Sequence, residues 1–466
     1  MTNIQKIQRA RLDFVRVFCV LILAGALSVS CTRRGGSSSA HAISADQNQA
    51  ATVQMDGDVT SQSSPVISPK AGDTTINIYI ENSGSMNGFI NNASSFQDAI
   101  QKMMVLLKYY YGEKAIKLNY INTAVHPQQI PANVAIEDFA ARMLTPAKFK
   151  GTGNVHSTDL NDIVKMVLNG VDDQSLSILI SDCIYSIVGS GTTTTLLAGC
   201  KNKTMGEFLE KSKEFPDLAT TVVKLASHFE GYYWDFKHPS GTASQTLSCS
   251  RPYYMCVIGT EANVDVFNDH ISVEEMNGYQ DKYILSCSDF SEVNYSVLPN
   301  THKMAMFRVR GATPYKTLEK ARLHGNLFQF AIAADLSTMP MSSSEKLDVS
   351  NYSVIQGEYT INGIYEIDTD HMHPVDRAIV NELNLTHEIV VSTDAYPADI
   401  TVGINRAVPQ WVKSTSSSDD TQINQDTQEQ GRTFGLQYFV EGISDAYKEV
   451  AQRKDYLTEF KITIKH

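Results

Sequence analysis

Residues 76–90 read INIYIENSGSMNGFI and carry the strongest indication of the fold. Three isoleucines alternate along a β-prone run that ends at the carboxylate of Glu81, and Ser83 and Ser85 follow with a glycine between them. A helix-like segment comes next, because apolar residues recur at helical spacing over residues 95–111. The order strand, turn, helix therefore predicts that these polar side chains lie at the tip of a strand, where open α/β sheets bind their ligands.

Strand-like and helix-like segments continue to alternate after this stretch. Residues 116–125 predict a second strand, and residues 176–181, LSILIS, form the continuous apolar run of a buried central strand. Residues 205–228 are predicted to be mostly helical, with a break at Pro216. This βαβ rhythm predicts an α/β domain over residues 73–270, with an open, mostly parallel sheet flanked by helices.

The character of the chain changes after residue 270. Short strand-like runs such as THEIVVST, DITVGIN and FKITIK stand between turn residues, which predicts a β-rich, sandwich-like domain over residues 271–466. One helix is expected to interrupt it, since Leu436, Phe439 and Ile443 share a face. Residues 413–432 are almost entirely polar and predict a disordered loop.

The N-terminal residues read as an export signal. Four basic residues precede an apolar run over 17–27, which is about half the roughly 20 residues that span a bilayer. The sequence LSVSC resembles the end of a bacterial lipoprotein signal peptide, although Ser28 stands where leucine is usual. This resemblance implies a signal peptide over 1–30 and a lipid anchor on Cys31, with ordinary secretion or a retained anchor as the alternative. Residues 31–72 are poor in large apolar groups and predict a flexible tether.

The net charge bears on the possible partners, and the cysteines bear on disulfide bonding. The net charge is −12, and it becomes −15 once residues 1–30 are removed, which argues against nucleic acid as a partner. The pairs Cys183–Cys200 and Cys249–Cys256 could each close a local loop and leave Cys287 over; five free thiols are the alternative. After Cys31 no acidic cluster follows, which favours the periplasmic side of the outer membrane over the cell surface.

The string Glu81-Asn82-Ser83-Gly84-Ser85 resembles the D-x-S-x-S motif that opens a von Willebrand factor A domain. Members of that family add a threonine from a loop before a later helix and an aspartate after a buried strand. Thr158 at a predicted helix start and Asp182 directly after residues 176–181 match those two positions. The resemblance covers residues 74–269 and departs from the family at Glu81, where aspartate is usual.

The resemblance implies a metal-ion-dependent adhesion site whose ligands are Glu81, Ser83, Ser85, Thr158 and Asp182. Such an oxygen set suits Mg²⁺, or Ca²⁺ or Mn²⁺ if the longer Glu81 side chain changes the geometry. The family uses this site for recognition, with an acidic residue of a protein partner completing the metal shell. The expected function is therefore cation-dependent protein binding by a lipid-anchored envelope protein that is not an enzyme.

Two other functions stay open at this stage. A metal-independent structural part of an envelope complex is expected if Glu81 has abolished coordination, and a hydrolase acting on glycans or peptides is the weaker alternative. His156 is a conceivable base beside Thr158, but no G-x-S-x-G elbow accompanies Ser83. A rival transition-metal cluster is conceivable in residues 366–374, which contain Asp368, Asp370, His371 and His373.

Overall fold

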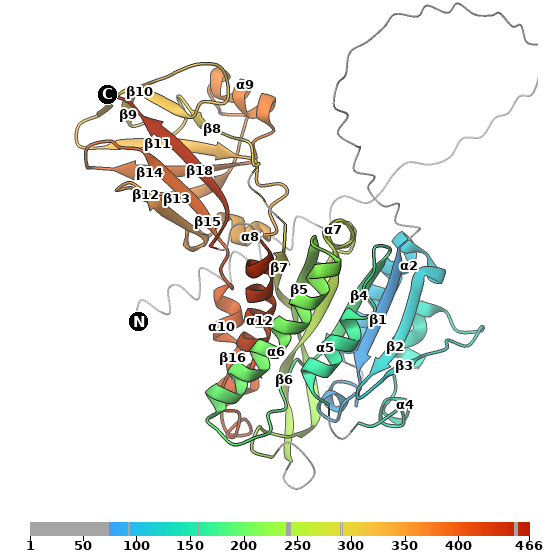
Figure 1. Ribbon diagram of the computed structural model, residues 1–466. Helices are drawn as coiled ribbons and strands as arrows, with labels where there is room; N and C mark the ends of the chain where they lie inside the picture. Colours follow the sequence, from blue (N-terminus) through green and yellow to red (C-terminus); the bar gives the residue numbers. More distant parts are fainter. Residues whose placement is uncertain are drawn as a thin grey trace, which may run out of the picture. The chain divides into compact units, whose positions relative to one another are not determined.

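A computed structural model describes residues 74–91, 94–142, 144–155, 158–238, 244–288, 290, 292–451 and 455–466 (Figure 1). The predicted signal peptide, Cys31 and the tether lie outside the described residues, as does His156. Within the described part, no helix is both long enough and apolar enough to traverse a bilayer. The fold is α/β followed by a β-rich region, which confirms the predicted class at that level.

The α/β region is built on a mixed sheet with the strand order β3-β2-β1-β4-β6-β5-β7. Its strands are β1 (Thr75–Glu81), β2 (Ile116–Ile121), β3 (Val125–Pro127), β4 (Ser175–Ser181), β5 (Leu218–Tyr233), β6 (Gln245–Thr260) and β7 (Tyr279–Ser286). Strand β1 pairs in parallel with β2 and β4, and every other pairing in this sheet is antiparallel, so the sheet is mixed, whereas the sequence predicted a mostly parallel one. Because β1 is central, its isoleucines are fully buried.

Helices cover both faces of this sheet (Figure 1). One face carries α2 (Ser95–Tyr111), α3 (Phe139–Arg142), α4 (Pro146–Lys150) and α7 (Glu261–His270). The other face carries α5 (Leu160–Leu168), α6 (Thr193–Glu214) and α12 (Leu436–Val450). Short 3-10 turns are η2 (Ser85–Phe89), η3 (Glu113–Ala115), η4 (Ile136–Asp138) and η5 (Val273–Glu275). Helix α2 starts in a capping box in which Ser94 and Gln97 satisfy each other's backbone.

Strands β5 and β6 form a long hairpin, and most of its first strand falls in the stretch that was predicted to be helical. The helix expected over residues 205–228 is wrong in its second half, because α6 ends at Glu214 and β5 begins at Leu218. The two strands pair along their whole lengths, whereas β6 pairs with β4 only over residues 254–258. Residues 225–233 and 245–253 therefore extend past the carboxyl end of β4, and we call this extension the hairpin arm.

The β-rich region contains two facing sheets with the orders β12-β15-β18-β10-β9 and β13-β14-β11-β8. The strands are β8 (Tyr295–Leu298), β9 (Ala305–Val309), β10 (Thr317–Leu323), β11 (Phe328–Ala334), β12 (Tyr352–Gln356), β13 (Thr360–Glu366), β14 (His387–Thr393), β15 (Ile400–Asn405) and β18 (Tyr456–Ile464). Residues such as Phe330, Ile389 and Phe460 fill the core between them. Helix α9 (Pro374–Leu383) covers the outer face of the second sheet, and α8 (Ser343–Leu347) and η6 (Val349–Asn351) precede β12.

The predicted boundary at residues 270/271 differs from the structure at two places. Strand β7 belongs to the α/β sheet, because it pairs with β5 over residues 279–286. The chain also leaves the sandwich after β15, and α12 packs on α6, where Lys201 Nζ lies 2.7 Å from Asp445 Oδ2. The amphipathic helix was thus predicted correctly, but its apolar face is buried in the α/β core.

The disordered loop expected over residues 413–432 is also a misreading. This segment contains parts of α10 (Gln410–Ser414), then β16 (Ser416–Ser417) and α11 (Thr427–Gln430), and β17 (Thr433–Phe434) follows it. Asp420 and Ile423 are buried in it. Its polarity misled the prediction, because its polar side chains are satisfied by tertiary hydrogen bonds that no local pattern reveals.

The five cysteines after Cys31 are free thiols, so neither predicted local disulfide is present. Cys249 and Cys256 lie on the same strand, β6, where an extended backbone holds them apart. Cys183 follows β4 and is buried, whereas Cys200 lies on α6. The alternative of unpaired thiols is therefore the one that the structure has.

One buried carboxylate of the sandwich predicts a measurable pH dependence. Glu388 on β14 faces α9 and is 6% exposed. Its Oε2 makes no hydrogen bond to the described residues, although His302 Nε2 lies 3.4 Å away. Burial, and secondarily the negative Asp376, raise the pKa of Glu388 to about 7. Because the folded state holds this proton more tightly, the stabilising contribution is present below the unfolded pKa and is lost as pH rises toward 7.

We therefore expect Glu388→Gln to match the wild type at pH 5 and to exceed its free energy of unfolding at pH 8 by about 2 kcal/mol. Urea denaturation at both pH values measures the difference. Glu366→Gln, at an exposed position of the adjacent strand, is the matched control and should change little at either pH. Equal stability of wild type and Glu388→Gln at pH 8 would contradict the prediction.

Candidate functional site

The two carboxylates of the candidate site are brought together by parallel strand pairing. Ile80 of β1 lies opposite Ile180 of β4, so the next residues, Glu81 and Ser181, are neighbours where both strands end. Asp182 follows directly after Ser181. Glu81 is 4% exposed and Asp182 is 3% exposed. Two acids that are far apart in the sequence are therefore buried side by side at one edge of the sheet.

Hydroxyl groups surround these carboxylates. Thr158 Oγ1 donates to Glu81 Oε1 at 3.4 Å, and Ser181 Oγ donates to Glu81 Oε2. The hydroxyls of Ser83 and Ser85 lie 3.0 Å apart and hydrogen bond to each other. The Ser83 hydroxyl also lowers the pKa of Glu81, and the Ser85 hydroxyl lowers that of Asp182. The structure thus brings all the predicted site residues into one cluster of oxygen atoms.

Asn82 fixes the loop that carries Thr158. Its buried Nδ2 donates to the carbonyl oxygens of Phe149 at 2.9 Å and Thr152 at 2.7 Å, and its Oδ1 accepts from Asn122 Nδ2 at 3.0 Å. One residue further on, the Gly84 N–H donates to the Val155 carbonyl at 3.0 Å. The residue between Glu81 and Ser83 therefore acts as a positioning residue, since it ties the end of β1 to residues 149–155.

Two buried carboxylic acids dominate the electrostatics of the site. Burial, followed by the nearby Asp182, raises the pKa of Glu81 to about 7, and three hydroxyl donors lower it in part. Burial also raises the pKa of Asp182, against the Ser85 hydroxyl and the Ile184 N–H, which favour the charged form. Neither carboxylate makes an ion pair with any Lys or Arg side chain that the structure describes. Two buried carboxylates that lack a basic partner among the described residues favour a bound cation, because its charge would offset theirs.

The guanidinium of Arg251 acts on Asp182 through its charge, but its own contacts are with other residues. Its guanidinium lies over the Tyr233 ring at 4.7 Å, and it donates to the carbonyl oxygens of Gln430 at 3.2 Å and Arg432 at 3.3 Å. It lowers the pKa of Asp182 only as a lesser cause. The site therefore keeps a deficit of positive charge.

The donor set is consistent with a hard divalent cation. It offers carboxylate oxygens from Glu81 and Asp182 and hydroxyl oxygens from Ser83, Ser85 and Thr158, and among the described residues it includes no sulfur or imidazole ligand. Mg²⁺, Mn²⁺ and Ca²⁺ prefer oxygen ligands of this kind. The added methylene of Glu81 lets its carboxylate span from Thr158 to Ser181, which explains how glutamate is accommodated at this position.

Sequence reasoning missed two residues of the site and one that borders it. Ser181 had a usable signal, because it immediately precedes Asp182 at the end of a predicted buried strand. Asn82 had a weaker one, since it stands inside the motif. Trp234 had none: it follows β5, yet a Cβ built on Gly84 would lie 3.1 Å from its Cζ3 atom. Only the hairpin arm brings Trp234 to this loop.

The rival transition-metal cluster does not form a buried site. His371 and Asp368 are exposed and lie 3.1 Å apart, and the His373 ring accepts a hydrogen bond from Val375 at the start of α9. No group of three or more His, Cys, Asp or Glu side chains arranged to hold a metal occurs in the parts of the chain that the structure covers. Among the described residues, the cluster at Glu81 contains two such side chains, Glu81 and Asp182, and its other oxygens belong to hydroxyl groups.

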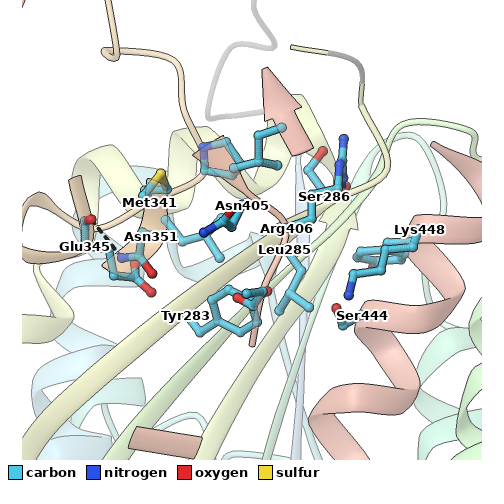
Figure 2. A pocket seen from close by; sticks show the side chains of 15 residues that line it. Tyr283, Leu285, Ser286, Met341, Glu345, Asn351, Asn405, Arg406, Ser444 and Lys448 are labelled. Atoms are coloured by element: carbon cyan, nitrogen blue, oxygen red, sulfur yellow. Dashed lines mark hydrogen bonds between the residues drawn. The ribbon is translucent and has the colours of Figure 1, made fainter. Parts of the chain in front are cut away.

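A separate cavity lies beside β7 and is too small for a metabolite. Figure 2 shows its lining, which includes Tyr283, Ser286, Glu345, Arg406 and Ser444. Its volume is about 40 Å³, which holds one or two water molecules. Arg406 donates to the carbonyl oxygens of Ser286 at 3.0 Å and Ser288 at 2.8 Å, so its side chain serves to hold backbone in place.

Comparison with known proteins adds no identity to this geometry. No family model, no curated protein and no solved structure matches the chain.

Proposed function

We propose that this protein binds a divalent cation at the Glu81–Asp182 cluster and uses that cation to capture an acidic group of a protein partner. The observation that carries the proposal is the burial of these two carboxylates among the hydroxyls of Ser83, Ser85 and Thr158, with no ion pair among the described residues. A cation there would offset the buried charge and present an open coordination position to a ligand carboxylate.

The resemblance of residues 81–85 to the von Willebrand factor A motif supports this proposal. The parallel order β2-β1-β4 and the short turn η2 after β1 agree with the arrangement that the motif requires. The antiparallel hairpin of β5 and β6 and the glutamate at position 81 are departures from it. The proposed role is recognition, as in the family whose motif residues 81–85 resemble.

The setting of this activity is part of the same proposal. The resemblance of residues 1–31 to a lipoprotein signal supports attachment through Cys31 to the outer membrane, facing the periplasm. The acidic net charge of −12 makes a metal-mediated contact useful, because an acidic partner is otherwise repelled.

Metal titration tests the proposal directly. We expect calorimetry to detect binding of Mg²⁺, Mn²⁺ or Ca²⁺ to the wild type and at least a tenfold loss of affinity in Asp182→Ala, since half of the carboxylate set is gone. Asp173→Ala is the matched control, because Asp173 is exposed at the opposite end of β4. Tb³⁺ gives a second readout: Trp234 lies against the site loop, so binding should produce sensitised emission when tryptophan is excited.

The controls separate the proposal from its structural alternative. Trp234→Phe should abolish most of the sensitised emission while calorimetric affinity persists, and Trp411→Phe should leave the emission intact. Absence of binding in the wild type, with binding gained in Glu81→Asp, would overturn the proposal and favour a metal-independent assembly role. Equal affinity of the wild type and Asp182→Ala would place the cation elsewhere.

A further inference from the structure

The hairpin arm forms one wall of the candidate site. Tyr254 lies opposite Ser181, where β4 ends. Beyond this level Leu225 still pairs with Tyr279 of β7, and past Ala226 β5 and β6 pair only with each other in this sheet. The arm packs directly on η2: a Cβ on Gly231 would lie 2.9 Å from the Gly88 Cα atom. The loop that carries Ser83 and Ser85 is therefore flanked by the arm.

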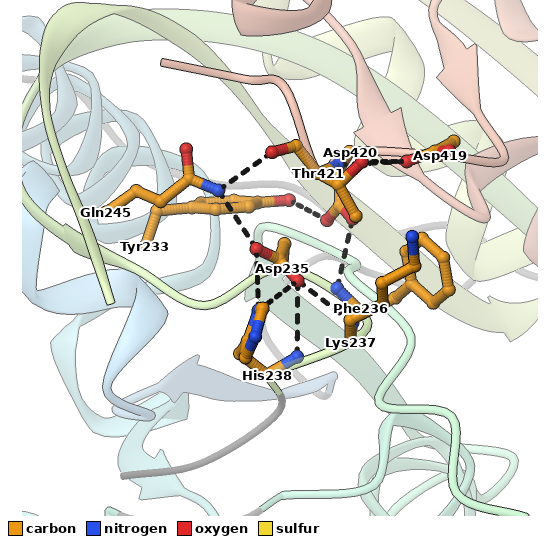
Figure 3. A network of polar contacts seen from close by, with 9 residues as sticks. All are labelled: Tyr233, Asp235, Phe236, Lys237, His238, Gln245, Asp419, Asp420 and Thr421. Atoms are coloured by element: carbon orange, nitrogen blue, oxygen red, sulfur yellow. Dashed lines mark hydrogen bonds and ion pairs between the residues drawn. The ribbon is translucent and has the colours of Figure 1, made fainter. Parts of the chain in front are cut away.

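A buried polar network holds the end of β5 and the residues that follow it (Figure 3). Tyr233 Oη donates to Asp420 Oδ2 at 2.6 Å, and the Phe236 N–H donates to Asp420 Oδ1 at 3.0 Å. Gln245 Nε2 donates to Asp235 Oδ2 at 2.9 Å and to the Thr421 carbonyl at 3.2 Å. Because Asp235 and Asp420 are both buried, these bonds hold residues 233–236 in a fixed position.

Two aromatic side chains lie here: Trp234 is on this fixed segment, and Tyr232 directly precedes it. Tyr232 is 60% exposed, and Trp234 is partly exposed, with ring centroids 6.3 Å apart. Trp234 contacts the Gly84 position between the two serines. We call these two residues the aromatic ledge. Large exposed aromatic rings next to a polar site are typical of binding hot spots.

We propose that the aromatic ledge is the specificity element of the site and selects a protein segment in which a large apolar side chain directly neighbours the metal-bound carboxylate. This inference rests on the proposed function. The two rings of the ledge are uncharged and adjoin the proposed cation site. They are therefore placed to contact the residue next to the carboxylate that binds the cation. An aromatic or aliphatic side chain gains the most from such contact, because it buries apolar surface and pairs with the rings.

Two capped tripeptides test the inference in the presence of Mn²⁺. One has aspartate followed by phenylalanine and the other has aspartate followed by alanine. We expect the wild type to bind the phenylalanine peptide about tenfold more tightly, which corresponds to one aromatic contact. Tyr232→Ala and Trp234→Leu should reduce this preference to about twofold or less, while the affinity for Mn²⁺ alone, measured by calorimetry, stays unchanged.

Tyr109→Ala is the matched control, since Tyr109 is an exposed aromatic residue on α2. It should keep the full preference for the phenylalanine peptide. If Mn²⁺ binds but the wild type treats the peptides alike or binds neither, the ledge inference is overturned and the cation site stands. If the preference survives in both ledge variants, the inference is likewise overturned. Absence of Mn²⁺ binding removes the proposed function and this inference together.

Discussion

Gly88→Ala is expected to lower the free energy of unfolding by about 3 kcal/mol, because the new methyl group overpacks a buried aromatic cluster. A Cβ at this position would lie 2.4 Å from the Cε2 and Cζ atoms of Phe229. Phe229 cannot move aside easily, since it is buried and packs edge-on against Phe89 with centroids 5.1 Å apart. The hairpin arm and η2 must therefore move apart. Because this also moves Trp234 away from the site loop, the Tb³⁺ emission that Trp234 sensitises should fall together with the free energy of unfolding.

Gly199→Ala is the control for the Gly88 substitution. Gly199 lies exposed on α6, and a Cβ there would meet no atom within 4 Å. Alanine in a helix costs less conformational entropy than glycine, so this variant should gain about 0.5–1 kcal/mol. Denaturant midpoints measure both changes. A Gly88→Ala protein as stable as the wild type would show that the arm does not press on η2 as described.

Asn82→Ala should cost about 3 kcal/mol and weaken cation binding at the same time. The substitution removes hydrogen bonds to the buried carbonyl oxygens of Phe149 and Thr152 and leaves the Asn122 amide without its Asn82 acceptor. Buried polar groups that lose their partners account for most of this cost. The affinity for Mg²⁺ should fall because residues 149–155, which precede Thr158, are no longer tied to β1.

Asn91→Ala separates this effect from the loss of any asparagine. Asn91 is exposed, and its Nδ2 donates to the Glu230 carbonyl at 2.6 Å, so water can replace the lost bond. Its cost should stay below about 1 kcal/mol, with cation affinity unchanged. Urea denaturation and calorimetric titration give the two measurements. An Asn82→Ala protein with wild-type cation affinity would show that Asn82 has a purely structural role.

The candidate site was largely predictable because its parts follow strand ends. The carboxyl ends of parallel strands meet at one edge of a sheet, so Glu81 after β1 and Asp182 after β4 had to converge once both strands were recognised. Thr158 was predictable from its place before α5. The resemblance to a known motif indicated these residues among the many serines and acids of the sequence. The pairing of β1 with β4 then explains why Glu81 and Asp182 lie together.

The hairpin arm and the segment 413–432 were not predictable for a shared reason. Residues 218–228 lie in a stretch that local pattern assigned to a helix, yet they pair with β6 and β7 in the sheet interior. Asp420 reads as a solvent-exposed acid within a polar run, but Tyr233 and the Phe236 N–H bind it in the core. In both cases partners that are distant in sequence overrode the local signal.

The α/β class and the β-rich region after it follow from the amino-acid sequence, since hydrophobic periodicity is a local property, and the motif resemblance adds the candidate residues after two of the strands. The folded chain was needed to show that β1 and β4 are neighbours, that the cluster is buried without an ion pair among the described residues, and that Asn82 and Trp234 contact its loops. Burial and contact between distant segments depend on how the whole chain packs, and no local pattern encodes them.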